Sequence, residues 1–389
     1  MTLLEKHPIR ILHVLYAMNT GGIQTWLMQI LRHIDRDRLQ MDFLVHILYP
    51  CAYTEEILAL GNQIILCPHP REYMWQPWQY DRTFKQLLRQ HGSYHIVHSH
   101  TAHFNGYVLR LARQAGIPVR IAHSHNDSFY ADAKEPLHRR LYIAFTKSLI
   151  SRSATMGLAA SDQAAAYLFG ENWQSDRRWQ VLYCSLDLTP FRQQIDPVAV
   201  RAEFNIPEDA FVIGHVGRFV EQKNPLFLIE IVAEVAKLEP KRYLFLVGNG
   251  SLQSEIEAKV QQVGLSDRVI FAGIRSDVPR LMLGAVDVFL FPSLYEGLGL
   301  VLIEAQAAGV PCVLSDVVPQ EADLIEPLMH RMSLSRSASA WAQAVVAARR
   351  NKCTIARSDA LAIVENSPFN IDIGAKNLVE FYESKVSIY

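Results

Sequence analysis

The chain has 389 residues, enough for two domains of ordinary size, each with its own hydrophobic core. Half of the residues are hydrophobic and a fifth are charged, which is typical of a globular protein and excludes a disordered chain. The 38 Lys and Arg residues balance 39 Asp and Glu residues and leave a formal net charge of -1, so bulk positive charge for nucleic-acid binding is also excluded.

Short apolar runs alternate with amphipathic stretches in the first half of the chain. The runs predict strands at residues 10–16, 41–45, 63–66, 95–98, 119–122 and 156–160. Each run is followed by a polar turn and a helical pattern, which indicates a parallel sheet covered by helices. The first run passes directly into Asn-Thr-Gly-Gly, so we interpret it as a strand and its turn rather than a signal peptide. No apolar run reaches the ~18 residues of a membrane span.

The second half repeats the same alternation. It predicts strands at 211–216, 243–247, 269–271, 288–291 and 310–314, with helices at 225–238 and 252–263 among them. Turn residues at 187–197 interrupt the pattern, so we predict one domain at 1–190 and a second at 191–370. The amphipathic stretch 373–386, within a final segment 371–389, is expected to cross back to the first domain. The expected fold is α/β, with two doubly wound Rossmann-like domains and a ligand cleft between them.

Cysteine, charge and histidine are distributed unevenly. The five cysteines are scattered without a C-x-x-C pair, which predicts neither a disulfide framework nor a thiolate zinc site and favours a reducing, cytoplasmic location. The two halves carry about +4 and about −5, and the first half holds 13 of the 15 histidines. The two domains are therefore expected to have different tasks.

Residues 291–309 are the most informative segment. Glu296 and Glu304 lie eight positions apart in an apolar run, with Gly297 and Gly299 where a strand would hand over to a helix. Eight residues of uninterrupted helix would advance about 12 Å, which is too far for the carboxylate pair of a glycosidase. Two such anchors would suit a long polar ligand lying over the helix N-terminus, where a phosphate is favoured. The alternative is an apolar helix with two incidentally paired glutamates.

A basic loop follows the predicted strand 211–216. Arg218 would leave the end of that strand, Lys223 follows in the same loop, and Asn224 with Pro225 is typical of a helix N-cap and first residue. An arginine and a lysine in one short loop above a sheet could clamp a diphosphate. The alternative is a pair of solvated surface cations.

Two glycine turns are further candidates. In Thr20-Gly21-Gly22, backbone amides at the start of a helix could approach an anion, although a simple tight turn explains the residues equally well. Gly248-Asn249-Gly250 has the first two glycines of a dinucleotide fingerprint but lacks the third, so a Rossmann dehydrogenase is disfavoured.

Histidines cluster around two predicted strands, at His95, His98, His100, His103, His123 and His125. Alternate strand residues point the same way, so the two His-x-His pairs could converge as a metal site. Carboxylate ligands are sparse, with only Asp127 and Asp132 nearby. A single working histidine facing the cleft and plain packing at the strand ends are the other two interpretations, and we expect no metal.

Aromatic and basic residues mix at 73–80 and at 139–152, the second stretch including Arg139, Arg140 and Lys147. Either stretch could lie at an anionic lipid surface, so peripheral membrane contact is a further hypothesis. The alternative is a solvated helix face with ordinary aromatic packing.

Several of these motifs together resemble the retaining GT-B glycosyltransferases of family 4. They are Gly217-Arg218 with Lys223-Asn224, Val247-Gly248-Asn249-Gly250, Phe271-Ala272-Gly273, and Glu296 followed after seven residues by Glu304. The first half, with Thr-Gly-Gly-Ile-Gln and Arg-Ile-Ala-His-Ser-His-Asn, is similar to the capsular and exopolysaccharide branch.

The resemblance implies roles for the matching residues. Arg218 and Lys223 would hold the donor diphosphate, and Glu304 would hold the ribose hydroxyls. Glu296 would bind the transferred sugar, helped by the backbone amides of Gly297, Leu298, Gly299 and Leu300. The base would be gripped around Gly248, Ile274 and Arg275. From the first domain, Gly22 beside Gly21 would close on the donor, and His125, or His123 in a shifted register, would contact the sugar.

The sequence thus predicts a metal-independent retaining glycosyltransferase without a cofactor. The expected donor is a nucleotide diphosphate sugar, specifically a UDP-sugar, and the expected acceptor a polysaccharide or a lipid-linked saccharide. The expected location is the cytoplasm, at the inner face of the membrane if the lipid hypothesis holds. Three alternative functions remain open. A nucleotide-sugar epimerase would form product without an acceptor, and a His-x-His metal hydrolase would lose activity to chelators. A catalytically inactive subunit would bind the donor but have no turnover.

Overall fold

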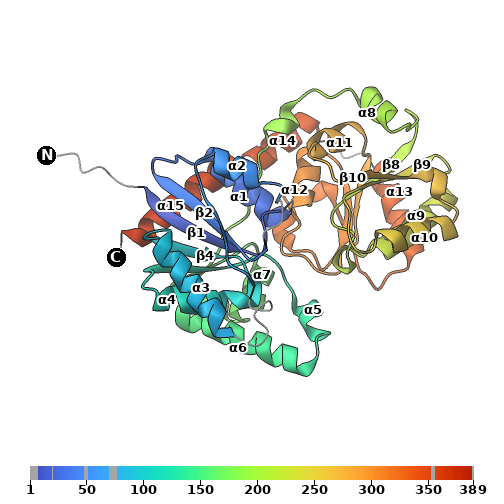
Figure 1. The fold of residues 1–389 in the computed structure, drawn as a ribbon. Helices are drawn as coiled ribbons and strands as arrows, with labels where there is room; N and C mark the ends of the chain where they lie inside the picture. The colour runs from blue at the N-terminus through green and yellow to red at the C-terminus, as the bar shows by residue number, and fades with distance from the viewer. Residues whose placement is uncertain (1–7, 20, 48–50, 70–76, 352–354, 388–389) are drawn as a thin grey trace. The chain divides into compact units, whose positions relative to one another are not determined.

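The computed structural model describes residues 8–19, 21–47, 51–69, 77–351 and 355–387. The chain forms two compact units (Figure 1), the first from Met1–Leu186 with Ile371–Tyr389 and the second from Asp187–Asn370. The sequence placed its domain boundaries at 190/191 and 370/371, and the units meet at 186/187 and 370/371.

The first unit is built on a seven-stranded parallel sheet in the order β3-β2-β1-β4-β5-β6-β7. All six predicted strands are present, and a short seventh, β7, was missed. The strands are β1 Ile9–Leu15, β2 Leu39–Val45, β3 Ile64–Leu66, β4 Ile96–Ser99, β5 Val119–Ser124, β6 Met156–Ala159 and β7 Trp179–Val181.

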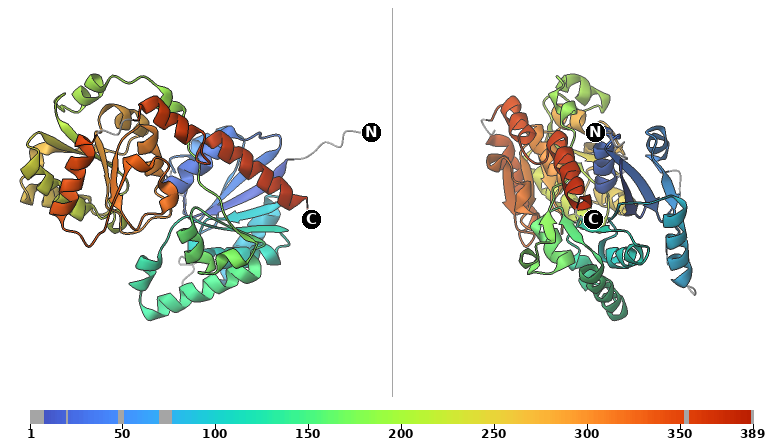
Figure 2. Two further views of the ribbon diagram at one scale, coloured as in Figure 1. Left: turned by 180° about the vertical axis from the view of Figure 1, so that it is seen from behind. Right: turned by 90° about the vertical axis from the view of Figure 1, so that its left-hand side faces the viewer.

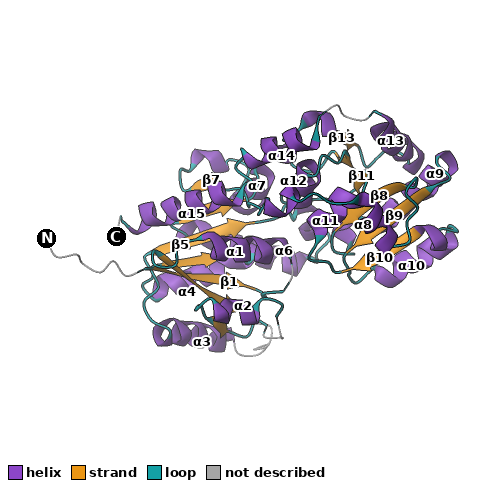
Figure 3. Cartoon of the chain, turned by 90° about the horizontal axis from the view of Figure 1, so that it is seen from above, coloured by secondary structure: helices purple, strands orange, loops and turns teal. Residues whose placement is uncertain are grey.

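Helices cover both faces of this sheet (Figure 3). They are α1 Gly22–His33, α2 Thr54–Ala59, α3 Pro77–Gln90, α4 Asn105–Gln114, α5 Phe129–Ala133, α6 Leu137–Ser153, α7 Asp162–Phe169 and α15 Ile371–Val386. Leu12 and Val14 of β1 belong to the same core cluster as Tyr80 of α3 and Val108 of α4. Because strand residues alternate between faces, His13 lies on the opposite face, where its ring stacks on Phe43.

The second unit is built on a six-stranded parallel sheet in the order β10-β9-β8-β11-β12-β13. All five predicted strands are present, and the edge strand β13 was missed. The strands are β8 Phe211–Val216, β9 Arg242–Val247, β10 Val269–Gly273, β11 Val288–Phe291, β12 Cys312–Ser315 and β13 Met329–Met332. The helices are α8 Pro197–Glu203, α9 Pro225–Leu238, α10 Gln253–Gln262, α11 Val278–Gly284, α12 Leu300–Ala307, α13 Ala338–Arg350 and α14 Arg357–Glu365.

Helix α15 returns from the second unit to the first (Figure 2), where it packs beside α1. The Ile371 amide donates a hydrogen bond of 2.9 Å to the Leu186 carbonyl, so the two chain crossings lie side by side. Farther along α15, Glu383 forms a 2.6 Å ion pair with Arg38.

Within the described part of the chain, no helix is long and apolar enough to cross a membrane. The four cysteines described there, at positions 51, 67, 184 and 312, are buried and free. Cys353, the fifth, lies outside the described residues.

Candidate active site

The loops that follow β8 and β9 are bonded to each other at the carboxyl edge of the second sheet. The Gly217 amide donates to the Val247 carbonyl at 3.0 Å, and the Phe219 amide donates to the Asn249 carbonyl at 2.7 Å. Gly248 has φ +130°, and a Cβ atom there would collide with the carbonyl oxygen of Gly217. Glycine is therefore required at this position for the two loops to pack.

The loop that follows β11 is attached to the same assembly. The Leu294 amide donates to the Gln222 carbonyl at 2.8 Å. Lys223 Nζ lies 2.5 Å from Glu296 Oε1, and the two side chains are only 15 % and 6 % exposed. Lys223 Nζ also lies 4.8 Å from the centre of the Phe291 ring. The structure thus brings together two predicted site residues that are far apart in the sequence. Each charge is the partner that the other needs, because an unpaired charge this deeply buried would be strongly destabilising.

Arg218 is the exposed cation of the same loop. Within the part of the chain that the structure describes, its guanidinium forms no ion pair and no side-chain hydrogen bond. The backbone on either side of it is fixed by the Gly217 and Phe219 hydrogen bonds. A positioned cation that the fold itself does not use is available to an anionic ligand.

The glutamate segment is a loop followed by a helix. Helix α12 begins at Leu300, and Gly299 before it adopts a left-handed conformation with φ +86°. Glu296 therefore precedes the helix, and the 12 Å advance calculated for an uninterrupted helix does not apply. Gly297 and Gly299 do lie at the transition that the sequence predicted.

Glu304 lies in the second turn of α12, half-buried and without an ion pair among the described residues. Burial raises the pKa of its carboxyl group to about 7. A carboxylate that is desolvated yet unpaired is a natural acceptor for hydroxyl groups of a ligand.

The other predicted residues of the second unit have more varied surroundings. Asn224 and Pro225 are the N-cap and first residue of α9, as predicted, but Asn224 is left-handed and its side chain makes no capping bond. Ile274 is 60 % exposed. Arg275 is engaged in ion pairs with Asp277 at 2.8 Å and Glu203 at 3.1 Å, so it is held in place by the protein itself.

The glycine turn of the first unit opens α1. Gly21 is the N-cap of that helix in an extended conformation, and Gly22 is its first residue. A Cβ atom at Gly22 would meet nothing within 4 Å, so open space lies beside it. Thr20, the first residue of the predicted motif, lies outside the described residues.

Five histidines converge on one face of the first sheet, and we call them the histidine array: His13, His98, His100, His123 and His125. His13 and His98 are register partners on β1 and β4, which explains why a residue from an earlier strand joins the predicted His-x-His pairs. Two predicted histidines lie elsewhere. His95 Nδ1 accepts a hydrogen bond from the Arg10 amide, and His103 Nδ1 lies 3.1 Å from Thr146 Oγ1.

The array forms two hydrogen-bonded chains. In the first, the Tyr382 hydroxyl lies 2.7 Å from His98 Nδ1, and His98 Nε2 lies 3.0 Å from His123 Nδ1. In the second, His13 Nδ1 lies 3.0 Å from His100 Nε2, and His100 Nδ1 lies 2.7 Å from His125 Nε2. One end of each chain is a buried Nε2 atom without a hydrogen-bond partner among the described residues, that of His123 in the first chain and that of His13 in the second.

Burial keeps the array neutral. It lowers the pKa of His13 and of His125 to about 3. Burial, followed by the neighbouring imidazoles, lowers the pKa of His98, His100 and His123 well below 6.5. His125 is only partly buried at its surface, unlike His123, and its Nδ1 faces the Cys184 sulfur at 3.7 Å.

Two groups of three within the array could hold a metal ion, since their ligand nitrogens lie within 4.8 Å of one another. They are His13 with His98 and His100, and His100 with His123 and His125. Neither group includes a carboxylate, so a divalent ion would keep its full charge in a buried site.

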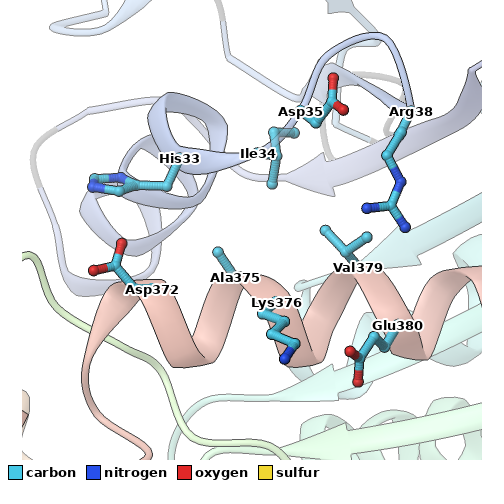
Figure 4. A pocket seen from close by; sticks show the side chains of 9 residues that line it. All are labelled: His33, Ile34, Asp35, Arg38, Asp372, Ala375, Lys376, Val379 and Glu380. Atoms are coloured by element: carbon cyan, nitrogen blue, oxygen red, sulfur yellow. The ribbon is translucent and has the colours of Figure 1, made fainter.

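A cavity of about 380 Å³ lies between the end of α1 and α15 (Figure 4), lined by charged residues such as Asp35, Lys376 and Glu380. It lies beside the loop that leads into β2, at the amino edge of the first sheet. Ligands of open α/β sheets bind at the opposite, carboxyl edge, so this cavity is not the predicted site.

Family comparisons agree with this geometry. The family described as glycosyl transferases group 1 matches residues 199–351, and the glycosyl transferase 4-like domain matches residues 21–184. EpsF of Bacillus subtilis (strain 168), which is named as a glycosyltransferase, is 37 % identical over 342 residues, covering 87 % of each chain. The chain belongs to the group 1 glycosyltransferases.

Further relatives of this glycosyltransferase are more distant. The UDP-Gal:alpha-D-GlcNAc-diphosphoundecaprenol alpha-1,3-galactosyltransferase of Escherichia coli is 28 % identical over 60 % of each chain. The crystal structure of HepE from Anabaena in complex with UDP-glucose has a TM-score of 0.78 at 20 % identity, covering 96 % of this chain and 99 % of HepE. The predicted family and the predicted GT-B fold are thus confirmed.

Sequence reasoning did not single out two buried groups of the glycosyltransferase. His215, near the end of β8, donates a hydrogen bond from Nδ1 to the Leu290 carbonyl at 2.9 Å, while its Nε2 is buried and has no hydrogen-bond partner among the described residues. Burial lowers its pKa to about 4. The Ser293 hydroxyl, in the loop that leads to Glu296, is also buried and makes no hydrogen bond within the described part of the chain. The position of each at the end of a predicted strand was the available signal.

Proposed function

We propose that the glycosyltransferase moves a glycosyl unit from a UDP-sugar to a polysaccharide or a lipid-linked saccharide, with retention at the anomeric carbon and without a metal. Membership of the family supports transfer over the epimerase and hydrolase alternatives. The names of two relatives support the donor, since one is a UDP-Gal transferase and HepE was solved with UDP-glucose. The E. coli relative also supports a lipid-linked acceptor, because its name specifies a diphosphoundecaprenol.

The observation that carries the proposal is Arg218, an exposed cation that has no ion pair among the described residues and lies on a loop that is fixed by neighbouring loops. When the nucleotide leaves, negative charge develops on the β-phosphate. A cation that is already positioned stabilises this charge with little reorganisation. The backbone amides at the start of α12, from Gly297 to Leu300, would add to the same stabilisation.

Lys223 and Glu296 act as a pair in this proposal. Their ion pair places the ammonium group beside the carboxylate before any donor binds. Lys223 would meet the diphosphate and Glu296 the hydroxyls of the transferred sugar, so the donor would bridge the two halves of the pair. The paired charges limit the cost of holding both groups in a nearly buried position while the site is empty.

Glu304 would accept hydrogen bonds from the ribose hydroxyls, and the rigid Gly248 turn with Ile274 and Arg275 would border the base. In the first unit, the amides of Gly21 and Gly22 would approach the donor. Of the two histidines of β5, His125 is better supported than His123 as the contact to the sugar, because His123 is fully buried. The remaining ring nitrogen of His125 faces only a weak thiol partner, which a hydroxyl group could replace.

The decisive experiment is Arg218→Ala. We expect turnover with a UDP-sugar to fall by about 10²–10³, because a positioned charge at the leaving group is lost. The matched control is Arg336→Ala, which removes another exposed cation of the second unit and leaves turnover unchanged. Equal turnover in the two variants would refute the role of Arg218. A thermal-shift panel of UDP- and GDP-sugars tests the base, since a bound donor stabilises the fold by mass action.

A further inference from the structure

Large apolar side chains are exposed together on α5 and α6. Six of the fifteen that are exposed in the described part of the chain lie between residues 129 and 145: Phe129, Tyr130, Leu137, Leu141, Tyr142 and Phe145. Leu137, Leu141 and Phe145 are 68 %, 62 % and 57 % exposed. They follow one another at intervals of four, so they form one stripe along α6. Such a patch on a soluble domain marks an interaction surface.

The opposite face of α6 is packed firmly on α4. Ile143, Thr146 and Ile150 are buried there. A Cβ atom at Gly106 of α4 would collide with the Thr146 carbonyl, so the two helix backbones are in close contact. The exposed stripe therefore belongs to a well-anchored helix whose orientation is fixed.

Helix α5 is fixed to the same surface by Lys147. The Lys147 ammonium donates to the Tyr167 carbonyl at 2.9 Å and lies 3.4 Å from the centre of the Tyr167 ring. The Tyr167 hydroxyl in turn donates to Asp132 of α5 at 2.8 Å, and its ring meets Phe129 edge-on. Lys147 is thus a structural cation, which agrees with the packing alternative that the sequence left open for this stretch.

The charge of this surface indicates its partner. Helix α6 contains four Lys or Arg residues and no Asp or Glu. Arg140 is exposed and lies within one turn of Leu137 and Leu141, at the edge of the stripe. Two acids lie nearby: Asp132 of α5, which is bonded to Tyr167, and the exposed Glu135 that precedes α6. On α6 itself, exposed Leu and Phe, a flanking tyrosine and cations without an acid are the composition of a helix that lies in an anionic lipid interface.

We infer that the stripe of Leu137, Leu141 and Phe145, with Arg140 at its edge, docks the enzyme on an anionic lipid bilayer. This inference rests on the proposed function, whose acceptor is lipid-linked. Helix α5 begins four residues after His125, so the surface follows directly from the strand end that carries the histidine proposed to contact the sugar. Docking by this surface would bring a membrane-bound acceptor close to that strand end.

The test is flotation of the full-length protein with vesicles, without donor or acceptor. We expect binding to vesicles of 30 mol % phosphatidylglycerol in phosphatidylcholine, and little binding to phosphatidylcholine alone. The variant L137S/L141S/F145S should bind at least about tenfold more weakly, because its apolar contact is removed. R140E should bind at least about fivefold more weakly, since one cation at an anionic surface is worth about that factor.

The matched controls lie in the second unit. V198S/L238S/I363S removes three apolar side chains that are 42–47 % exposed, and R336E reverses an exposed cation. Both should bind vesicles as the parent protein does. A UDP thermal shift in every variant reports whether the fold and the donor site are intact.

Three results would overturn docking: no binding of the parent protein, equal binding by the stripe variant, or a dimer that the stripe variant abolishes in sedimentation velocity. The last result would assign the stripe to a second copy of the chain. Vesicle binding without sugar transfer to any acceptor would instead refute the proposed function and leave docking intact. Transfer to a water-soluble acceptor without vesicle binding would refute docking alone.

Discussion

Acidification should unfold the first unit well before the second. The histidine array is neutral in the folded state, with pKa values lowered to about 3 for His13 and His125 and lowered well below 6.5 for the other three. In the unfolded chain the same imidazoles titrate near 6.5. Because the unfolded state binds more protons below that pH, stability is fully present above pH 6.5 and is lost progressively as the pH falls toward 3.

The magnitude follows from the number of groups. At pH 5.5, each buried imidazole that stays neutral costs about 1.4 kcal/mol relative to neutral pH. Five of them give an upper bound of about 7 kcal/mol, which is comparable to the whole free energy of unfolding of a typical domain, about 5–15 kcal/mol. The second unit contributes fewer such groups, chiefly His215, whose pKa burial lowers to about 4.

Hydrogen exchange read by mass spectrometry measures both units in one sample. After correction for the intrinsic pH dependence of exchange, peptides from β1, β4 and β5 should lose several kcal/mol of protection between pH 7.5 and pH 5.5. Peptides from β8 and β9 serve as the internal control and should lose about 1–2 kcal/mol. Equal loss of protection in the two sets of peptides would show that the histidines of the array are not held neutral in the folded state at pH 5.5.

Two further predictions concern the second unit. Glu304→Gln should raise the free energy of unfolding at pH 8 by about 1–3 kcal/mol, because a carboxyl group with its pKa raised to about 7 is costly to ionise above that pH. Urea unfolding curves at pH 8 and pH 5 measure this free energy. A gain of the same size at pH 5 would contradict the prediction. The same variant should bind UDP more weakly in calorimetry. Gly248→Ala should destabilise the fold by about 2–4 kcal/mol, because the new Cβ atom would clash with Gly217 and the position has a positive φ. Gly264→Ala is the control: it has φ +69° but lies in open space, so it should cost about 1 kcal/mol. Equal urea midpoints in the two variants would contradict the close packing of the loops.

Local patterns were sufficient for most of the fold. The predicted bounds of β8, β11 and α9 coincide with those in the structure, because each is a strongly apolar run bounded by polar, turn or capping residues. The missed strands β7 and β13 are short edge strands with the sequences Trp-Gln-Val and Met-His-Arg-Met. They lack a clear alternation, and their pairing with a preformed sheet decides their conformation.

The sequence predicted individual residues of the candidate site but not the contacts between them. The Lys223–Glu296 pair depends on β8 and β11 being neighbours in the sheet, which no local pattern reports. The same limit applies to His13, which joins the array because β1 lies beside β4. Local spacing did predict that alternate histidines share a face, since that rule depends only on the strand period.

Because α15 belongs to the first unit but is synthesised last, the first unit is completed on the ribosome only after the second. Residues 187–370 have been synthesised in full before the chain supplies Tyr382, the hydroxyl partner of His98. The second unit can therefore finish folding while the first, begun much earlier, still exposes the groove on its sheet that α15 will fill. A nascent chain stalled just short of α15 would display a second unit with all of its residues and a first unit that still lacks one of its helices.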